Sequence, residues 1–340
     1  MKRFPALALV LLLALAAGAC GDKTGAWGDP NSIIAAVDPE LWSEIEETVF
    51  DALEPTVLTV TEEKAFTVAH TVPGAEGWGN FRKFRQMLLV GPISDPYVAE
   101  ALDEVDDAGE ITPPQILQAR NVWARNQMVT ILVTSEDDPA ADVRARLPEL
   151  AALYDEQYRN WARQKMYVSG QDTALADTLM NQYGFSLVLP EVYYWDMRDS
   201  VLIFRNDNPD PAELIRQVTV SWISPVPDPD EFQAEEMLEW RAGIAEEHYS
   251  EPQLVDLSDR RAGPARFGQL QAYEIQAAWT NAPEAGWPAG GPFILRAVIC
   301  PQQDRMYLID AWLYAPGKEK YEYMIQLQTI LNTFRCEGMA

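Results

Sequence analysis

The chain has 340 residues with 52 acidic and 26 basic side chains, which gives a net charge of −26. Such an acidic surface repels nucleic acid and anionic lipid headgroups, because binding to both depends on Lys and Arg. We therefore expect no nucleic-acid partner. The length is sufficient for one large or two medium domains with proper hydrophobic cores.

The first 19 residues have the three-part form of a secretory signal. Two basic residues precede an apolar run over 4–17 that is too short to span a membrane. Cys20 follows three small residues, as in a bacterial lipobox, although Ala17 stands where leucine is usual. We expect cleavage after residue 19 and acylation of Cys20 with palmitate or a similar chain, which leaves a net charge of −28. The alternative is a conventional signal peptide followed by a coincidental cysteine.

A tether rich in Gly and Asp over 20–31 leads to a first unit over 32–168. The apolar pattern predicts strands at 32–37, 66–72, 86–90 and 127–134. Asp38-Pro39-Glu40 is a typical helix start and predicts a helix with apolar residues up to Leu53. A second, long helix is expected from Asp137 to Tyr167, broken or started late by Pro148.

A second unit is expected over 169–340. It begins with a helix that Gly184 ends. Further helices are predicted at 231–247 and 321–334, and strands at 185–189, 201–205, 218–223, 271–279, 293–300 and 306–313. Strands come mostly in consecutive runs with helices interspersed. The predicted class is therefore α+β, with two units of mixed, mainly antiparallel sheet covered by helices.

Cys300 and Cys336 are the cysteines that remain if Cys20 is acylated. An exported chain permits them to pair, so a Cys300–Cys336 disulfide and two separate buried thiols both stay open. Their separation is too long for a metal knuckle, and His70 and His248 lie beside no other candidate ligand. We expect no metal, no cofactor and no catalytic residue.

Aromatic residues in turn-like sequence suggest a ligand site. Trp195 and Trp287 stand in such segments, and Gly290, Gly291 and Phe293 follow closely after the second one. Glycines permit close backbone approach where a side chain could not fit. We expect a shallow groove between the 190–196 and 286–293 loops, lined by these five residues. The alternative is a hydrophobic plug that holds the loops to the sheet.

Two segments of the second unit resemble a family of predicted bacterial lipoproteins of unknown function, common in Bacteroidota-type bacteria. They are GFSLVLPEVYYWDMRDSVLIFRND (184–207) and the stretch from the GGPF turn to ILNTF (290–334). This resemblance carries over no catalytic residue. The order of elements over 184–334 also resembles PsbP/Mog1-type folds, which host binding and scaffold roles, although a fold alone does not fix a function.

The predicted function is that of a cell-envelope lipoprotein acting without catalysis in binding or assembly. The lipid would anchor it to a membrane, with the body in the periplasm or at the outer surface of the cell. The other partner would be an envelope protein or a small ligand. The alternative is a carboxylate-dependent hydrolase acting on glycan, which would need two buried carboxylates facing each other across a cleft.

Overall fold

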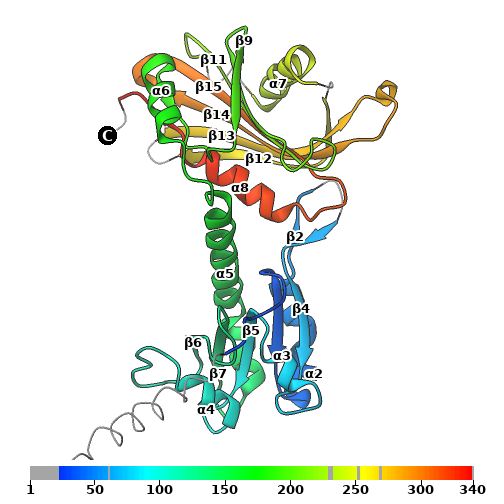
Figure 1. The fold of residues 1–340 in the computed structure, drawn as a ribbon, viewed down its shortest axis with the longest axis vertical. Helices are drawn as coiled ribbons and strands as arrows, with labels where there is room; N and C mark the ends of the chain where they lie inside the picture. The colour runs from blue at the N-terminus through cyan, green and yellow to red at the C-terminus, as the bar shows by residue number, and fades with distance from the viewer. Residues whose placement is uncertain (1–22, 60–61, 229–232, 251–252, 268–269, 339–340) are drawn as a thin grey trace, which may run out of the picture. The chain divides into compact units, whose positions relative to one another are not determined.

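The computed structural model describes residues 23–59, 62–228, 233–250, 253–267 and 270–338, with the backbone alone at 257–259 and 267. The chain forms two compact units (Figure 1). One comprises the chain up to Pro55 together with Phe66–Leu153, and the other comprises Thr56–Ala65 together with the chain from Tyr154 onward. Cys20 and the first part of the predicted tether lie outside the described residues.

The observed border differs from the expected one at 168/169. The end of a long helix, α5 (Pro139–Met166), belongs to the second unit, and so does the small hairpin of β2 (Thr56–Val57) and β3 (Glu63–Lys64). A hydrogen-bond pair explains the hairpin's place: Glu63 accepts from the backbone N–H groups of Lys320 (2.6 Å) and Tyr321 (2.8 Å) and so caps a helix far along the chain.

The first unit is built on a five-stranded sheet of order β4-β1-β5-β7-β6. Its strands are β1 (Ser32–Ala36), β4 (Thr67–Thr71), β5 (Gln86–Gly91), β6 (Gln115–Arg120) and β7 (Met128–Val133). β1 pairs parallel with β4 and β5, β5 pairs parallel with β7, and β6 is the antiparallel edge. The carboxyl ends of the parallel strands therefore meet at one edge of the sheet.

Helices of the first unit begin at that edge. They are α2 (Pro39–Leu53), the short α3 (Trp78–Phe81), α4 (Pro96–Leu102) and the first part of α5. Both α2 and α5 begin where the sequence predicted helix starts. Asp38 accepts from the N–H of Glu40 (2.9 Å), and proline occupies the first turn of α2, as predicted. The expectation that Pro148 breaks or delays α5 is wrong: the helix runs from Pro139 to Met166 with Pro148 inside it.

The second unit is built on a seven-stranded antiparallel sheet of order β12-β13-β14-β15-β11-β10-β9. The strands are β9 (Tyr194–Arg198), β10 (Val201–Asn206), β11 (Ile215–Ile223), β12 (Gln253–Phe267), β13 (Leu270–Asn281), β14 (Gly290–Cys300) and β15 (Arg305–Tyr314). A separate pair joins β8 (Phe185–Ser186) to β16 (Arg335–Cys336).

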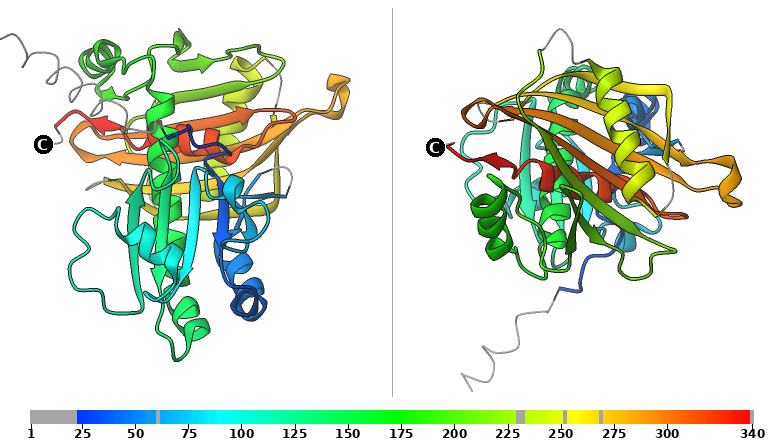
Figure 2. Two further views of the ribbon diagram at one scale, coloured as in Figure 1. Left: turned by 60° about the horizontal axis from the view of Figure 1, so that its bottom comes forward. Right: turned by 90° about the horizontal axis from the view of Figure 1, so that it is seen from above.

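Different helices cover the two faces of this sheet (Figures 1 and 2). α6 (Thr173–Tyr183) and α8 (Tyr321–Leu331) pack on one face, which we call the α8 face. α7 (Ala234–His248) packs on the other, the α7 face. Side chains alternate between the faces: Phe293 and Leu295 belong to the α7 core, whereas Ile294 belongs to the α8 core.

The predicted α+β class, with mixed and mainly antiparallel sheets, is confirmed; parallel pairs predominate only in the first unit. β12 is a strand that the sequence pattern did not predict. It is an edge strand whose sequence is rich in charge and contains Gly263 and Pro264, so it lacks the apolar alternation by which strands are predicted.

Candidate ligand groove

The structure does not bring Trp195 and Trp287 together. Trp195 lies on the edge strand β9, and its ring packs against Phe204 (centroids 6.4 Å apart), a core residue of the α8 face. Trp287 lies in the loop between β13 and β14 and lines a groove on the α7 face. The expected groove between the 190–196 and 286–293 loops is therefore wrong: the β9–β10 register puts Trp195 beside Phe204 on the α8 face, whereas the loop of Trp287 lies on the α7 face.

A groove does form around Trp287, with a volume of about 320 Å³. This volume is at the lower end of the range of ligand pockets. The lining is mainly apolar and aromatic: Pro211, Ala212, Ile215, Tyr249, Ser250, Gln253, Trp279, Asn281, Trp287, Ala289, Trp312 and Tyr314. We call this set the aromatic groove.

Three buried or half-buried rings form the wall of the aromatic groove. Trp279 and Trp312 pack edge to face with centroids 5.4 Å apart, and Tyr249 lies 5.6 Å from Trp312. Trp279 is fixed by its indole N–H, which donates to the carbonyl oxygen of Leu313 (3.2 Å). Trp287 differs from them, because 56% of its side chain is exposed. A rigid aromatic wall thus faces one accessible tryptophan.

The glycines expected at the site have a packing role. A Cβ atom on Gly291 would lie 1.7 Å from the carbonyl oxygen of Leu313, so no side chain fits there. Gly290 pairs with Thr280 at the start of β14. Phe293 is fully buried, and the guanidinium carbon of Arg241 lies 4.0 Å from its ring centroid. These residues support the groove from behind and do not line it.

Asn281 holds the loop that carries Trp287. Its side-chain oxygen accepts from the N–H of Ala289 (2.8 Å), and its amide nitrogen donates to the carbonyl of Trp287. The backbone N–H of Asn281 donates to the carbonyl of Ala289 (3.0 Å). Because the amide of Asn281 is engaged by the protein itself, it positions Trp287 but has little left to offer a ligand.

A buried ion pair lies beneath the groove and attaches α7 to the sheet. Arg241 of α7 and Asp310 of β15 are 3.0 Å apart, and their side chains are 0% and 1% exposed. Tyr249 donates to Asp310 (2.7 Å), and Arg241 donates to Gln253. Burial, reinforced by the Asp310 carboxylate, raises the pKa of Tyr249 well above its ordinary value. The phenol therefore stays a neutral donor.

The indole N–H of Trp312 is the one polar group of this aromatic wall without a hydrogen-bond partner among the described residues. The indole nitrogen is buried. A buried donor without an acceptor is costly, and this nitrogen has too little accessible surface for a ligand in the groove to bond it. The groove therefore offers a ligand mainly apolar and aromatic surface.

The glycan-hydrolase alternative finds no matching geometry in the described residues. Asp310 is the one buried carboxylate there, and it is paired with Arg241. Paired catalytic carboxylates of glycosidases are instead two groups facing the same bond. In the described chain, no group of three or more His, Cys, Asp or Glu side chains is arranged to hold a metal ion.

The first unit has its own crevice, of about 640 Å³, at the carboxyl ends of β1, β5 and β7. Ligands of open α/β sheets often bind at such an edge. Two of its lining carboxylates cap helices: Asp38 accepts from Glu40 N–H (2.9 Å) at the start of α2, and Asp95 accepts from Tyr97 N–H (2.8 Å) at the start of α4. Acids occupy the helix starts where an anionic ligand would bind.

Cys300 and Cys336 form a disulfide with Cα atoms 6.2 Å apart. Cys300 ends β14, and Cys336 lies in β16, just after α8. The bridge fastens the end of the chain to the α8 core, away from the aromatic groove. It is a structural element of the second unit and not part of a site.

Sequence reasoning missed Arg241 and Asp310. Asp310 stands within the apolar run MYLIDAWLY, and Arg241 occupies a position on the apolar stripe of α7, between Met237 and Ile244. A charged residue at a register position that must be buried predicts a buried partner of opposite charge. That signal was present in the sequence.

Each half of the chain matches a domain of unknown function. Residues 172–333 match the family model of DUF4837, and residues 26–167 match that of DUF8532. The predicted resemblance to a family of unknown function is confirmed at this level. Curated proteins give no match to the chain. Among the described residues, no helix has the length and apolarity needed to cross a membrane.

Three solved structures illustrate the remote likenesses. Cyanobacterial PsbP of Synechocystis has a TM-score of 0.32 and 11% identity, covering 45% of this chain and 86% of its own. The Ran-binding protein Mog1p of Saccharomyces cerevisiae has a TM-score of 0.32 and 11% identity, covering 46% and 92%. LpqN of Mycobacterium tuberculosis, involved in cell envelope biogenesis, has a TM-score of 0.29 and 14% identity, covering 45% and 83%. These TM-scores are too low to assign the chain to a fold family. The PsbP/Mog1-type order of elements therefore stays a prediction.

Proposed function

We propose that the protein is a lipid-anchored envelope protein whose second unit binds a small amphiphile in the aromatic groove, without catalysis. The observation that carries the proposal is the groove itself: an exposed Trp287 opposite a rigid wall of Trp279 and Trp312. Aromatic walls with few polar groups suit apolar ligands. The anchor would be the acyl chain on Cys20.

An apolar chain suits the groove better than a sugar. Sugar recognition requires several free polar side chains beside an aromatic platform. Among the lining residues, Asn281 is engaged by the loop and Gln253 by Arg241. What remains for a ligand is apolar surface and the hydroxyl groups of Ser250 and Tyr314, which line the groove. A ligand with an aliphatic or aromatic body and one hydrogen-bonding head group, such as a medium-chain carboxylic acid, matches this lining.

Binding of a dansyl-labelled undecanoate to the purified full chain tests this proposal. Trp287→Ala should lower the affinity about tenfold, because a tryptophan contact in an interface is typically worth more than 1 kcal/mol. Trp195→Ala is the matched control: Trp195 is also partly exposed, at 39%, but it lies on the α8 face. Equal affinities of the Trp287→Ala variant and the unmodified protein would reject the proposal.

The anchor is tested separately by replacing Cys20 with Ser. The variant should lose its acyl chain and leave the membrane fraction, because the acyl chain is the proposed anchor. Mass spectrometry of the N-terminal peptide and a high-salt membrane wash measure both effects. Undiminished membrane association after the wash would contradict lipidation at this residue.

A further inference from the structure

The α8 face of the second unit holds a second pocket, of different chemistry. It has a volume of about 270 Å³ and lies between the β2 segment, α5, α8 and strands β12 to β14. Its polar lining includes Thr56, Arg159, Arg261, Gln276, Tyr321 and Gln328. The charged lining residues described there are the two arginines, and no carboxylate lines it. We call it the arginine pocket.

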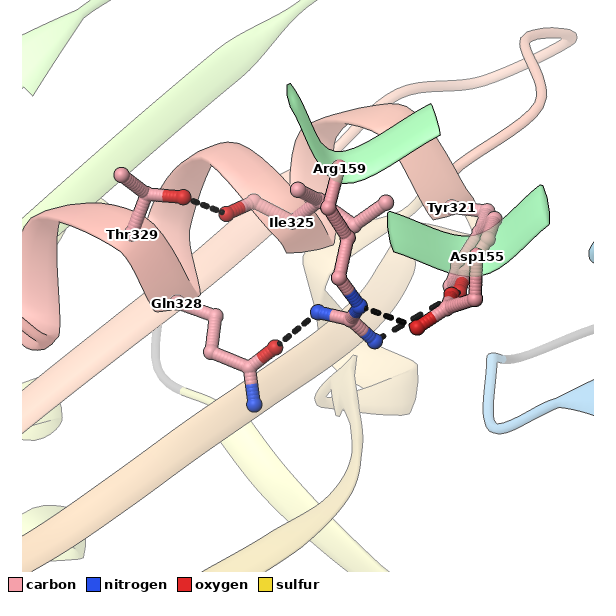
Figure 3. Close-up of polar contacts among 6 residues, drawn as sticks. All are labelled: Asp155, Arg159, Tyr321, Ile325, Gln328 and Thr329. Carbon is pink, nitrogen blue, oxygen red and sulfur yellow. Dashed lines mark hydrogen bonds and ion pairs between the residues drawn. The ribbon is translucent and has the colours of Figure 1, made fainter. Parts of the chain in front are cut away.

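Arg159 is held rigidly at the pocket wall (Figure 3). Its Nε donates to Asp155 (2.6 Å) and its Nη1 to Gln328 of α8 (2.7 Å). Tyr321 donates to the other oxygen of Asp155 and also receives a long bond, 3.5 Å, from Nη2 of Arg159. Both oxygens of Asp155 are thus engaged, and the guanidinium is fixed between α5 and α8.

The bonds that hold Arg159 do not use all of its donors. A guanidinium has five N–H groups, and three are engaged by Asp155, Gln328 and Tyr321. About two fifths of the side chain, 41%, remains exposed. A fixed guanidinium with donors to spare is suited to a bidentate contact with a carboxylate or phosphate.

Arg261 supplies a second positive charge, which no described carboxylate neutralises. It stands opposite Gln276 in the β12–β13 register, and its side chain forms no ion pair or hydrogen bond with the described residues. Its neighbour Arg260 pairs with Glu235 of α7 (3.4 Å), on the α7 face. The chain has twice as many acidic as basic side chains, so an arginine in a pocket without a carboxylate partner is unexpected.

We propose that the arginine pocket binds a small oxyanion, a carboxylate or phosphate group, between Arg159 and Arg261. Asp155 offsets one of the two positive charges, so a singly charged oxyanion completes the balance. Ile294, Met324 and Ile325 give the pocket an apolar side that accommodates a short carbon chain on the anion. This site is independent of the aromatic groove, which lies on the opposite face of the sheet.

Calorimetric titration of the full chain with inorganic phosphate and with acetate, at constant ionic strength, tests the site. Saturable heat is expected for at least one of the two probes; phosphate alone would identify a phosphate site, and acetate alone a carboxylate site. Arg261→Ala should weaken binding about tenfold or more, because a charge-assisted contact is lost. Arg260→Ala removes the same charge one residue away on the other face and should leave the affinity unchanged.

Arg159→Lys provides a second variant that retains the charge but loses the planar fork, and it should also weaken binding. Thermal unfolding without anion separates binding from folding, since Arg261 is exposed and its loss should not shift the midpoint. If Arg260→Ala and Arg261→Ala weaken anion binding equally, the binding depends on overall charge and not on a defined pocket, which would overturn the proposal. So would the absence of saturation with either anion.

Discussion

The two faces of the seven-stranded sheet are made by the same strands but carry different chemistry. On the α8 face, the disulfide, α6 and α8 close the core, and the polar groups gather at its border with α5. On the α7 face, a single helix attached by a buried ion pair leaves an aromatic groove near its end. The period of two along each strand lets one sequence build a closed structural layer and an open one.

The largest expected effect comes from the ion pair that attaches α7. Arg241→Ala leaves Asp310 buried without its cation, which should lower the free energy of unfolding by about 3–5 kcal/mol. The double variant Arg241→Met/Asp310→Leu should recover most of that loss, because no charge is left buried. Guanidinium unfolding curves measure both. A double variant as unstable as the single one would show that α7 is not held in this way.

The disulfide should stabilise the α8 face by a similar but smaller amount. Its cysteines are 36 residues apart, and a loop of this length corresponds to about 3–4 kcal/mol in the chain-entropy estimate. Replacing both Cys300 and Cys336 by Ser should lower the unfolding free energy accordingly, with ligand binding in the aromatic groove retained. A loss of amphiphile binding in the folded variant would contradict the separation of the two faces.

Alkaline pH should weaken the second unit on both faces. Burial raises the pKa of Tyr249 on the α7 face well above 10, and burial raises the pKa of Tyr167 to about 12. The unfolded chain releases these protons near pH 10, whereas the folded chain retains them. The stabilisation is therefore complete below pH 10 and is lost as pH rises through the folded values. Unfolding curves at about pH 9 and pH 11 test this, with Tyr167→Phe expected to reduce the change.

Much of the fold could be predicted from the sequence, because caps and apolar periods are local signals. Asp38-Pro39 and Gly184 mark helix ends that the structure contains, and the strand at 127–134 corresponds to β7. β12 could not be predicted in this way, since an edge strand needs no apolar face. Where α5 passes from one unit to the other depends on tertiary contacts, which no local pattern records.

The candidate groove was only half predictable from the sequence. Turn-like sequence suggested that both tryptophans line one groove; Trp287 does line a groove on the α7 face, but Trp195 lies on the α8 face. Register decides which face a strand residue occupies, and a shift of one residue reverses it. The pairing of Trp195 with Phe204 is fixed by the β9–β10 hairpin and could not be read from composition or spacing.

Photo-crosslinking tests the central claim most directly. The full chain is irradiated with a medium-chain fatty acid that carries a diazirine at its end, with and without excess unlabelled acid, and the labelled peptides are identified by mass spectrometry. The account predicts label that the unlabelled acid displaces, in the segments 211–215, 249–250 and 281–289 that line the aromatic groove. Displaceable label confined to β9 or to the first unit would contradict it.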